Sequence, residues 1–574
     1  MGTIVQFDQV TYTYPGAEKP AIQDISLSIH EGELILITGP SGAGKTTLCS
    51  TLNRIVPESY AGNFQGKLLV YGKDISKRRI GDMAFIAGLL FQDPSGQLTN
   101  PTVEDEIAFG PENRGLPVKE VERLIKEYSG YVGMEAYLQR PPQALSGGQQ
   151  QSVALASVLA MEPEIYVLDE PTSNLDPLGS DLVFQLMKKL AEDKKKTVLI
   201  VEHKLEKVID LVNRIIVMDK GHIVYDDTPD EVLRHSRELR KIGVITPQIN
   251  QFCSWLNEEK KHLTQPRNLD QAVNIFKKLL PQVPPREQLL HEGEKLKRYR
   301  KFTEPIIHVE DLRFGYTPNV EVLHGINLDI YKGQFVSIVG HNGSGKTTIV
   351  KHFNGLHQPL SGRVLIKGQD TKQTTVAELS KSVGYCFQNP DHQIFSSIVA
   401  DELAYGPRNL SWSKEDINRT VHETARLLGI ENLLDANPYN LSKGQRQQIA
   451  VAAILCMKPD ILIVDEPTTG QDPVQSRAMM DMMKFLNEEM GKTIVVITHD
   501  MGIAAEYSDR IVAMHMGCII ADGTPREVFA EEEVLRSSNL EAPQITRLFQ
   551  YCGLSSPTVV DVDEACRLLG NISL

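Results

Sequence analysis

Apolar residues form two kinds of short run along this sequence. In the first kind they alternate with polar residues, which predicts strands of an antiparallel sheet at 4–10 and 25–29, and again at 306–312 and 326–330. In the second kind nearly every residue is apolar, which is typical of strands buried on both faces. Runs of the second kind lie at 34–37, 165–168 and 197–201, and at 335–339, 461–464 and 494–497. Because helical stretches separate these runs, we predict an α/β fold with a parallel sheet.

The whole pattern occurs twice. The stretches from about 100 to 165 and from about 396 to 460 are more polar, and we expect each to be a helical insertion into a sheet domain. The copies meet near residue 300, in the basic run 295–301, which is predicted to be a solvated linker, with contact to lipid headgroups as the alternative. The predicted segments are a first repeat at 1–235, its extension and linker at 236–303, a second repeat at 304–531 and its extension at 532–574.

Composition narrows the class of protein. The 574 residues include 60 Lys and Arg against 74 Asp and Glu, and the resulting charge of −14 argues against nucleic acid as the main partner. The seven cysteines are scattered without a C-x-x-C pair, which indicates reduced thiols rather than disulfides or metal ligands. Apolar runs stay shorter than the roughly 18–20 residues that span a bilayer, so we expect no membrane segment in this sequence.

Each half carries the pattern G-x-x-x-x-G-K-[ST], which forms a phosphate-binding loop between a strand and a helix. The first loop is Gly39, Pro40, Ser41, Gly42, Ala43, Gly44, Lys45, Thr46 and Thr47, and the second is Gly340, His341, Asn342, Gly343, Ser344, Gly345, Lys346, Thr347 and Thr348. Four features follow in each half at a constant offset of 296 residues: Gln92 and Gln388, the runs 145–149 and 441–445, the pairs Asp169-Glu170 and Asp465-Glu466, and finally His203 and His499. Such a repeated order predicts two nucleotide triphosphate sites.

Each residue type matches a requirement of the triphosphate. The loop glycines let backbone N–H groups surround phosphate oxygens at a helix N-terminus. Lys45 is expected to reach the β- and γ-phosphates, and Thr46 with Asp169 is expected to hold Mg²⁺. Glu170 is expected to act on the water that attacks the γ-phosphate. Lys346, Thr347, Asp465 and Glu466 repeat this set. A capped helix start is the alternative for each Asp-Glu pair, and the phosphate loop upstream makes catalysis the preferred interpretation.

The runs Leu145-Ser146-Gly147-Gly148-Gln149 and Leu441-Ser442-Lys443-Gly444-Gln445 lie 23 residues before the strand-end Asp. Together with the histidines 34 residues after that Asp, they resemble ATP-binding-cassette ATPases over essentially the whole chain. The resemblance implies two tandem cassettes, each with a phosphate-loop parallel-sheet core, an antiparallel β subdomain and a helical subdomain. It also implies that the cassettes pair head to tail within the chain, so that each ATP lies between one loop and the other signature.

The resemblance assigns further roles. Lys45 would face Ser442 and Gly444, and Lys346 would face Ser146 and Gly148, each pair standing at a helix N-terminus. The glutamines Gln92 and Gln388 would contact Mg²⁺, and His203 and His499 would contact the γ-phosphate. Tyr14 and Tyr316 are candidates to stack on adenine, with ordinary core packing as the alternative. Lys443 stands where the first half has Gly147, and because Gly444 is kept we expect an altered site rather than an inactive one. Gln471 in place of Leu175 is another mild difference between the halves.

A narrower resemblance follows the glutamines. The motif FQ-x-P-x-x-Q and the later segments 106–113 and 402–409, of the form E-x-A-[FY]-G-P-x-N, look like the ATPase of energy-coupling-factor importers of vitamins and transition-metal ions. It implies two partners, a transmembrane coupling subunit and a small substrate-binding membrane protein. Asp105, Glu106, Asp401 and Glu402 could receive arginines of the coupling subunit, and helix N-terminal carboxylates are an equal alternative.

We therefore predict the ATP-hydrolysing subunit of an importer, held peripherally at the cytoplasmic face of the membrane. One alternative is a twin-cassette ATPase that acts on ribosomes or nucleic acid, which we would expect to carry a charged arm, cysteine clusters or a basic surface. Another is a switch that binds ATP without turnover, and this would predict the loss of a catalytic Glu or His. The sequence shows neither set of features.

Overall fold

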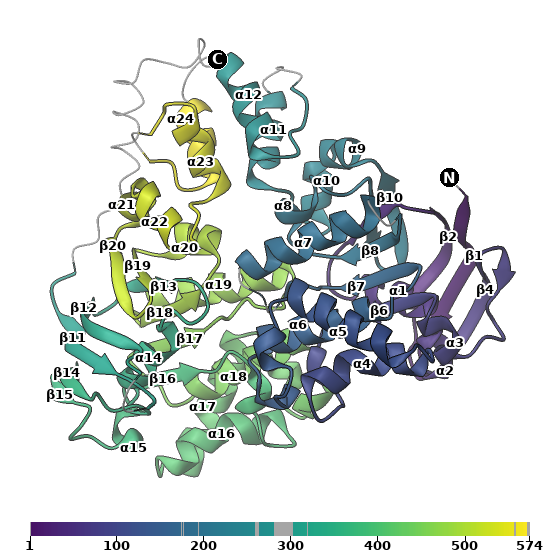
Figure 1. Cartoon of the computed structure of the whole chain (residues 1–574). Helices are drawn as coiled ribbons and strands as arrows, with labels where there is room; N and C mark the ends of the chain where they lie inside the picture. Colours follow the sequence, from purple (N-terminus) through teal and green to yellow (C-terminus); the bar gives the residue numbers. More distant parts are fainter. Residues whose placement is uncertain are drawn as a thin grey trace. The chain divides into compact units, whose positions relative to one another are not determined.

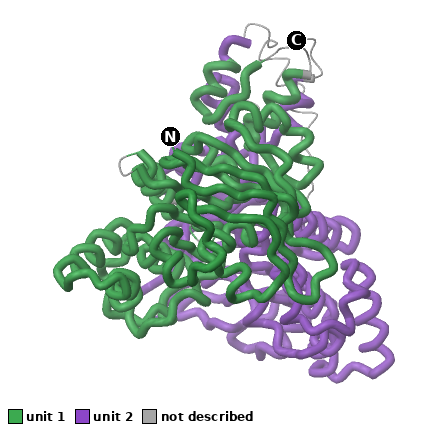
Figure 2. The backbone as a smooth tube through the Cα atoms, turned by 90° about the vertical axis from the view of Figure 1, so that its right-hand side faces the viewer, with its two compact units in different colours: residues 1–276 green, residues 277–574 purple. Residues whose placement is uncertain are grey.

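The computed structural model divides the chain into two compact units, 1–276 and 277–574 (Figure 2). It describes residues 2–173, 175, 177–192, 195–258, 263–279, 302–317, 320–555 and 558–570. The units divide inside the predicted extension at 236–303, and the basic run at 295–301 lies outside the described residues. Across the described residues, no helix has the length and apolar character needed to cross a membrane.

The first unit opens with a four-stranded antiparallel sheet whose strand order is β2-β1-β4-β5. Its strands are β1 (Thr3–Thr13), β2 (Ile22–His30), β4 (Asn63–Val70) and β5 (Lys73–Asp74). Buried and exposed residues alternate along much of β1 and β2, as the alternating pattern predicts for a sheet with one face in the core.

A six-stranded sheet forms the centre of this unit, with the order β10-β9-β3-β8-β7-β6. The strands are β3 (Leu34–Thr38), β6 (Ala87–Leu90), β7 (Ile165–Asp169), β8 (Thr197–Val201), β9 (Arg214–Asp219) and β10 (His222–Asp227), and only the β9–β10 pairing is antiparallel. Every residue of β3, β7 and β8 is buried, because both faces are covered. Leu34 and Leu36 pack into one core cluster, and Ile35 and Ile37 into another on the opposite face.

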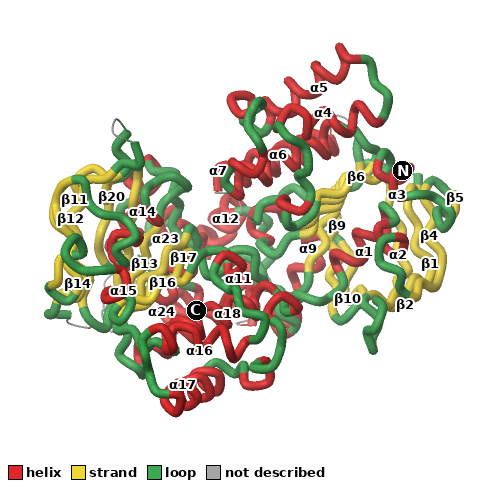
Figure 3. Tube along the Cα trace, turned by 90° about the horizontal axis from the view of Figure 1, so that it is seen from below, coloured by secondary structure: helices red, strands yellow, loops and turns green. Residues whose placement is uncertain are grey.

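Helices complete the first unit, and the last of them, α12, extends past the unit boundary at residue 276. They are α1 (Lys45–Leu52), α2 (Ile55–Glu58), α3 (Ile80–Ala84), α4 (Val103–Asn113), α5 (Val118–Tyr131), α6 (Gly147–Ala160), α7 (Pro177–Glu192), α8 (Leu205–Val208), α9 (Pro229–Arg234), α10 (Ser236–Lys241), α11 (Gln248–Glu258) and α12 (Leu269–Leu279). Helices α4, α5 and α6 form the expected helical insertion and lie together, apart from the antiparallel strands β1, β2 and β4 (Figure 3).

The second unit repeats this architecture (Figure 1). Its antiparallel sheet has the order β12-β11-β14-β15, and its central sheet has the order β16-β17-β18-β13-β19-β20. The strands are β11 (Pro305–Phe314), β12 (Leu323–Tyr331), β13 (Phe335–Val339), β14 (Ser361–Ile366), β15 (Gln369–Asp370), β16 (Val383–Cys386), β17 (Ile461–Asp465), β18 (Thr493–Thr498), β19 (Arg510–His515) and β20 (Cys518–Gly523). The helices are α14 (Lys346–Phe353), α15 (Val376–Leu379), α16 (Val399–Asn409), α17 (Lys414–Leu427), α18 (Lys443–Leu455), α19 (Pro473–Glu488), α20 (Met501–Tyr507), α21 (Pro525–Ala530), α22 (Glu532–Ser537), α23 (Gln544–Tyr551) and α24 (Val562–Gly570). The predicted fold class is confirmed.

Candidate active site

The first phosphate loop joins the end of β3 to the start of α1, and its backbone is tightly enclosed. A Cβ added to Gly39 would lie 2.1 Å from the Met218 carbonyl oxygen, and one on Gly44 would lie 2.4 Å from the Ala21 carbonyl oxygen. Side chains at these two positions would therefore force the loop away from the sheet. Gly42 has open space around it, and its φ of 77° explains the glycine there, because larger residues rarely adopt that conformation.

The two loop lysines are placed alike. The Nζ of Lys45 donates to the Gly39 carbonyl at 2.8 Å and to the Pro40 carbonyl at 2.9 Å. In the second unit, the Nζ of Lys346 donates to the carbonyls of Gly340 and His341 at 2.8 and 2.9 Å. Both lysines are buried, so each ammonium is held at its own loop.

A hydroxyl and a carboxylate meet at the end of β7 in the first unit and at the end of β17 in the second. The Oγ1 of Thr46 donates to Oδ2 of Asp169 at 2.6 Å, and the Oγ1 of Thr347 donates to Oδ2 of Asp465 at 3.0 Å. Burial raises the pKa of Asp169 to about 6, although the bond from Thr46 opposes the rise. Burial also raises the pKa of Asp465. In the second unit the hydroxyl of Tyr385 donates to the same Asp465 oxygen at 3.0 Å.

The structure brings Glu170 together with two other predicted site residues. His203 Nε2 lies 3.1 Å from Oε1 of Glu170, and the side-chain amide of Gln92 donates to Oε2 at 2.8 Å. The φ of Glu170 is 49°, a left-handed conformation that is uncommon for residues other than glycine. Its own N–H donates to the Val201 carbonyl at 3.0 Å, so the end of β8 holds this conformation.

Glu466, the counterpart of Glu170 in the second unit, has different hydrogen-bond partners. His499 presents Nδ1 to Oε2 of Glu466 at 2.8 Å, and the Thr469 hydroxyl donates to the same oxygen at 3.0 Å. Burial acts to raise the pKa of Glu466, but His499 and the nearby Lys346 ammonium outweigh it and hold the pKa below its usual range. Gln388 is exposed, and no hydrogen bond joins it to Glu466 in the described part of the chain.

Both signature serines begin a helix, as predicted. Ser146 caps α6 and Ser442 caps α18, each in a reciprocal capping box with the glutamine three residues later. A Cβ on Gly444 would lie 2.7 Å from Oε1 of Gln475, and one on Gly470 would lie 2.8 Å from Nζ of Lys443. The Lys443 ammonium therefore lies beside the loop at 470 of its own unit.

The candidate adenine residues Tyr14 and Tyr316 lie beside the phosphate loops. The hydroxyl of Tyr14 is 3.1 Å from Oγ1 of Thr47, and that of Tyr316 is 3.1 Å from Oγ1 of Thr348. Tyr316 is 60% exposed and packs edge-on against the rings of Phe314 and His357. Tyr14 packs edge-on against two other tyrosine rings. Stacking on adenine stays a prediction for both residues.

The comparisons with known proteins agree with this geometry. A family described as "ABC transporter" matches residues 22–173 and 323–469, and these ranges contain both loops and both signatures. The chain belongs to the ABC transporter ATPase family.

Relatives match this family member along its whole length. A provisionally named ABC transporter ATP-binding protein of Methanosarcina acetivorans is 38% identical over 573 residues, covering 98% of this chain and 92% of the relative. Another from Caldanaerobacter subterraneus is 42% identical over 551 residues, covering 95% of each chain. The solved structure of cbiO1 from Clostridium perfringens, described as part of the ABC transporter complex cbiONQ, is 37% identical and covers 43% of this chain and 100% of that chain, with a TM-score of 0.39.

The family assignment confirms two predictions. The chain is an ATPase of a transporter, and it consists of two fused cassettes that bind ATP. The individual roles of the site residues, the metal and the head-to-tail pairing stay predictions.

One part of the docking prediction is wrong. Glu106 is buried, and its Oε2 accepts the N–H groups of Thr99 and Asn100 at 2.9 and 2.8 Å. Glu402 is also buried, and its Oε2 accepts the N–H groups of Phe395 and Ser396 at 3.1 and 2.8 Å. Both carboxylates hold the loop before their helix, so they cannot receive a partner's arginine.

Sequence reasoning missed several residues that contact the site. Tyr385 bonds the strand-end Asp465 and has Leu89 as its counterpart. Glu202 precedes His203 and accepts the Thr172 hydroxyl at 2.7 Å, and its counterpart is Thr498. A comparison of the two halves at the constant offset of 296 residues would have exposed both differences.

Proposed function

We propose that each cassette holds one Mg²⁺–ATP at its phosphate loop. The adjacent Thr46 hydroxyl and Asp169 carboxylate support this proposal, because oxygen ligands are those that Mg²⁺ prefers, and Thr347 with Asp465 offers the same set. Gln92 and Gln388 are further proposed ligands. Mg²⁺ bound there would neutralise charge that develops on the phosphates.

Hydrolysis in this proposal proceeds by attack of water on the γ-phosphate. Glu170 orients that water and accepts its proton, and Glu466 does the same in the second site. Each glutamate stands beside a histidine, at 3.1 Å in the first unit and 2.8 Å in the second, so the histidine can bind the γ-phosphate while holding the glutamate. Buried lysines at the loops supply the positive charge that the phosphates need.

The head-to-tail arrangement is part of the same proposal. Lys45 shares its ATP with Ser442 and Gly444, and Lys346 shares its ATP with Ser146 and Gly148. The helix N-termini at Ser146 and Ser442 support this arrangement, because they offer N–H groups and the positive end of a helix dipole to an anion.

We further propose that the transporter is an importer of a small solute, a vitamin or a transition-metal ion. The observation that carries this step is the motif after each glutamine, which forms a 3₁₀ turn and then α4 or α16. The partners would be a transmembrane coupling subunit and a small substrate-binding membrane protein, and the chain would lie peripherally at the cytoplasmic face of the membrane. The solute would then be recognised by another chain.

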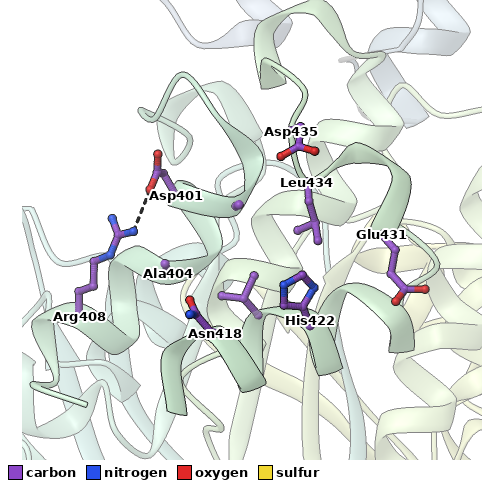
Figure 4. A pocket seen from close by; sticks show the side chains of 10 residues that line it. Asp401, Ala404, Arg408, Asn418, His422, Glu431, Leu434 and Asp435 are labelled. Carbon is purple, nitrogen blue, oxygen red and sulfur yellow. Dashed lines mark hydrogen bonds and ion pairs between the residues drawn. The ribbon is translucent and has the colours of Figure 1, made fainter. Parts of the chain in front are cut away.

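Docking is assigned to the acids that remain accessible, Asp105 and Asp401. The side chain of Asp401 is 49% exposed and pairs with Arg408 at 2.8 Å. It lines a pocket of about 460 Å³ between α16, α17 and the turn after α17, together with His422, Glu431 and Asp435 (Figure 4). Three carboxylates line the pocket, of which Asp401 pairs with Arg408 and Glu431 pairs with Arg426 at 3.2 Å. This acidic lining favours a basic segment of a partner, because guanidinium groups bind carboxylates in pairs of hydrogen bonds.

The experiment reverses these charges. Asp105→Lys with Asp401→Lys is expected to release the protein from membranes of the cells that produce it, as measured by flotation, while ATP binding is retained. Glu31→Lys with Glu533→Lys changes the net charge equally at exposed positions elsewhere and should remain bound. Undiminished recovery of the first variant would place docking elsewhere. Wild-type protein that does not bind such membranes and sediments with ribosomes would favour the alternative function, a twin-cassette ATPase that acts on ribosomes.

A further inference from the structure

A buried carboxylate connects the two loops that carry the catalytic residues of the first cassette. Glu202 stands just after β8 and is 5% exposed. Its Oε1 accepts the N–H groups of His203 and Lys204 at 2.8 and 3.1 Å. Its Oε2 accepts the Thr172 hydroxyl at 2.7 Å, and Thr172 lies two residues after Glu170. One side chain thus joins the histidine loop to the glutamate loop.

The second cassette supports its histidine differently. Thr498 occupies the position of Glu202, and its Oγ1 accepts the N–H of Asp500 at 3.0 Å. Asp500 in turn accepts the N–H groups of Gly502 and Ile503 at 3.1 and 3.2 Å and so caps α20. These bonds lie within the loop and helix that follow β18. The pair Thr498 and Asp500 therefore orders the chain on either side of His499 through local bonds, whereas Glu202 also bonds the neighbouring loop.

We propose that Glu202 is a positioning residue of the first ATP site, which fixes the backbone of His203 against the loop that carries Glu170. The inference rests on the proposed roles of Glu170 and His203. Hydrogen bonds to a buried carboxylate are short and strong, and removal of that acceptor would take away the bonds that tie the loop of His203 to the loop of Thr172. A displacement of about 1 Å at a reacting group can cost on the order of 10²-fold in rate.

Burial raises the pKa of Glu202, and the nearby Glu170 carboxylate adds to the rise. A neutral side chain of the same shape is therefore compatible with this site. In Glu202→Gln the amide oxygen can accept both backbone N–H groups, while the amide NH₂ donates to the Thr172 hydroxyl. Glutamine thus separates the hydrogen-bonding role of Glu202 from any role of its charge.

The test uses the full chain with Glu466→Gln, so that turnover reports the first site. In this background Glu202→Ala is expected to lower kcat by about 10- to 100-fold with little change in KM for ATP. Glu202→Gln is expected to recover most of that loss. The double substitution Glu202→Thr with Lys204→Asp transplants the arrangement of the second cassette and should also recover turnover.

Thr172→Val removes the other end of the bond between the loops. It should lower kcat in the same direction as Glu202→Ala, and the two losses should be less than additive, because both remove one shared interaction. ATP binding and thermal unfolding of every variant show that it is folded. If Glu202→Ala does not fold, the positioning role of Glu202 is still tested by Glu202→Gln, by the double substitution and by Thr172→Val.

Three results would overturn the inference. Turnover of a folded Glu202→Ala equal to its parent would show that the carboxylate positions nothing. A loss with Glu202→Gln as large as with alanine would show that the charge, not the hydrogen bonding, is what matters. If Glu202→Thr with Lys204→Asp binds ATP but does not recover turnover, the bonds of Thr498 and Asp500 in the second cassette are not equivalent to those of Glu202. The proposed catalytic role of Glu170 is tested separately: turnover that persists in Glu170→Gln with Glu466→Gln would contradict that role.

Discussion

Replacing Asp169 by asparagine is expected to stabilise the first cassette at neutral pH when nucleotide and metal are absent. The carboxylate is 2% exposed, and burial raises its pKa to about 6 from the ordinary value of 3.8. A carboxyl group that holds its proton more tightly in the folded state lowers the free energy of unfolding as pH rises between the two pKa values. The loss begins near pH 4 and is complete above about pH 6.

The size of the effect follows from the same numbers. A rise from 3.8 to about 6 corresponds to a cost on the order of 3 kcal/mol, and roughly half of it is already present at pH 5. Asparagine carries no charge, so Asp169→Asn removes this cost while its carbonyl can still accept from Thr46. For a domain of this size, each kcal/mol moves Tm by about 2–4 °C, so the variant should gain roughly 6–12 °C above pH 7.

Scanning calorimetry with EDTA and without nucleotide, at pH 5 and pH 7.5, measures this gain. Other titratable groups contribute equally to the Tm of wild type and variant, so their contribution cancels when the two Tm values are compared at one pH. Asp8→Asn, at an exposed position on β1, is the matched control and should show no pH-dependent gain. A gain for Asp169→Asn that is equal at both pH values, or a loss of stability at pH 7.5, would refute the reasoning.

Three further predictions concern turnover and stability. Glu170→Gln with Glu466→Gln should lower phosphate release by about 10²–10⁴-fold while ATP binding by equilibrium dialysis persists, and near-normal release would remove both assigned base roles. Lys443→Gly should change turnover modestly and Gly444→Asp severely, because a carboxylate there would repel the γ-phosphate; equal small effects would contradict the head-to-tail pairing. Tyr385→Phe should lower the free energy of unfolding of the second cassette by about 1.5–3 kcal/mol, the usual worth of a hydrogen bond to a charged group, and an unchanged denaturant midpoint would contradict this.

Much of the fold was predictable because its strands carry a strong local signal. Runs such as 34–37 and 165–168 are apolar on both faces, and a parallel sheet covered by helices on both sides accommodates that pattern. The phosphate loops were predictable for a related reason, since Gly39 and Gly44 pack so closely against carbonyl oxygens that no side chain fits. The positions of these glycines in the sequence motif therefore follow from the lack of space for a side chain in the folded loop.

The partners of the acidic side chains were not predictable in this way. Glu106 and Glu402 stand near a helix start, where both docking and loop anchoring are reasonable expectations. The choice depends on N–H groups six and seven residues away, whose direction is set by how the preceding loop folds. Lys443 is similar, because its ammonium lies beside a loop that only the folded structure brings close.

The two ATP sites share most of their motif residues and differ in what those residues touch. Asp465 bonds a tyrosine hydroxyl where the first half has Leu89, and His203 is supported by Glu202 where the second half has Thr498. Each difference changes the hydrogen bonds of a buried group. Hydrogen bonds of buried groups shift pKa values and fix side-chain geometry more than those of exposed groups do. Identical motifs therefore do not make identical surroundings, and we expect turnover measured on the intact chain to combine unequal contributions from the two sites. Silencing one glutamate at a time is the measurement that separates them.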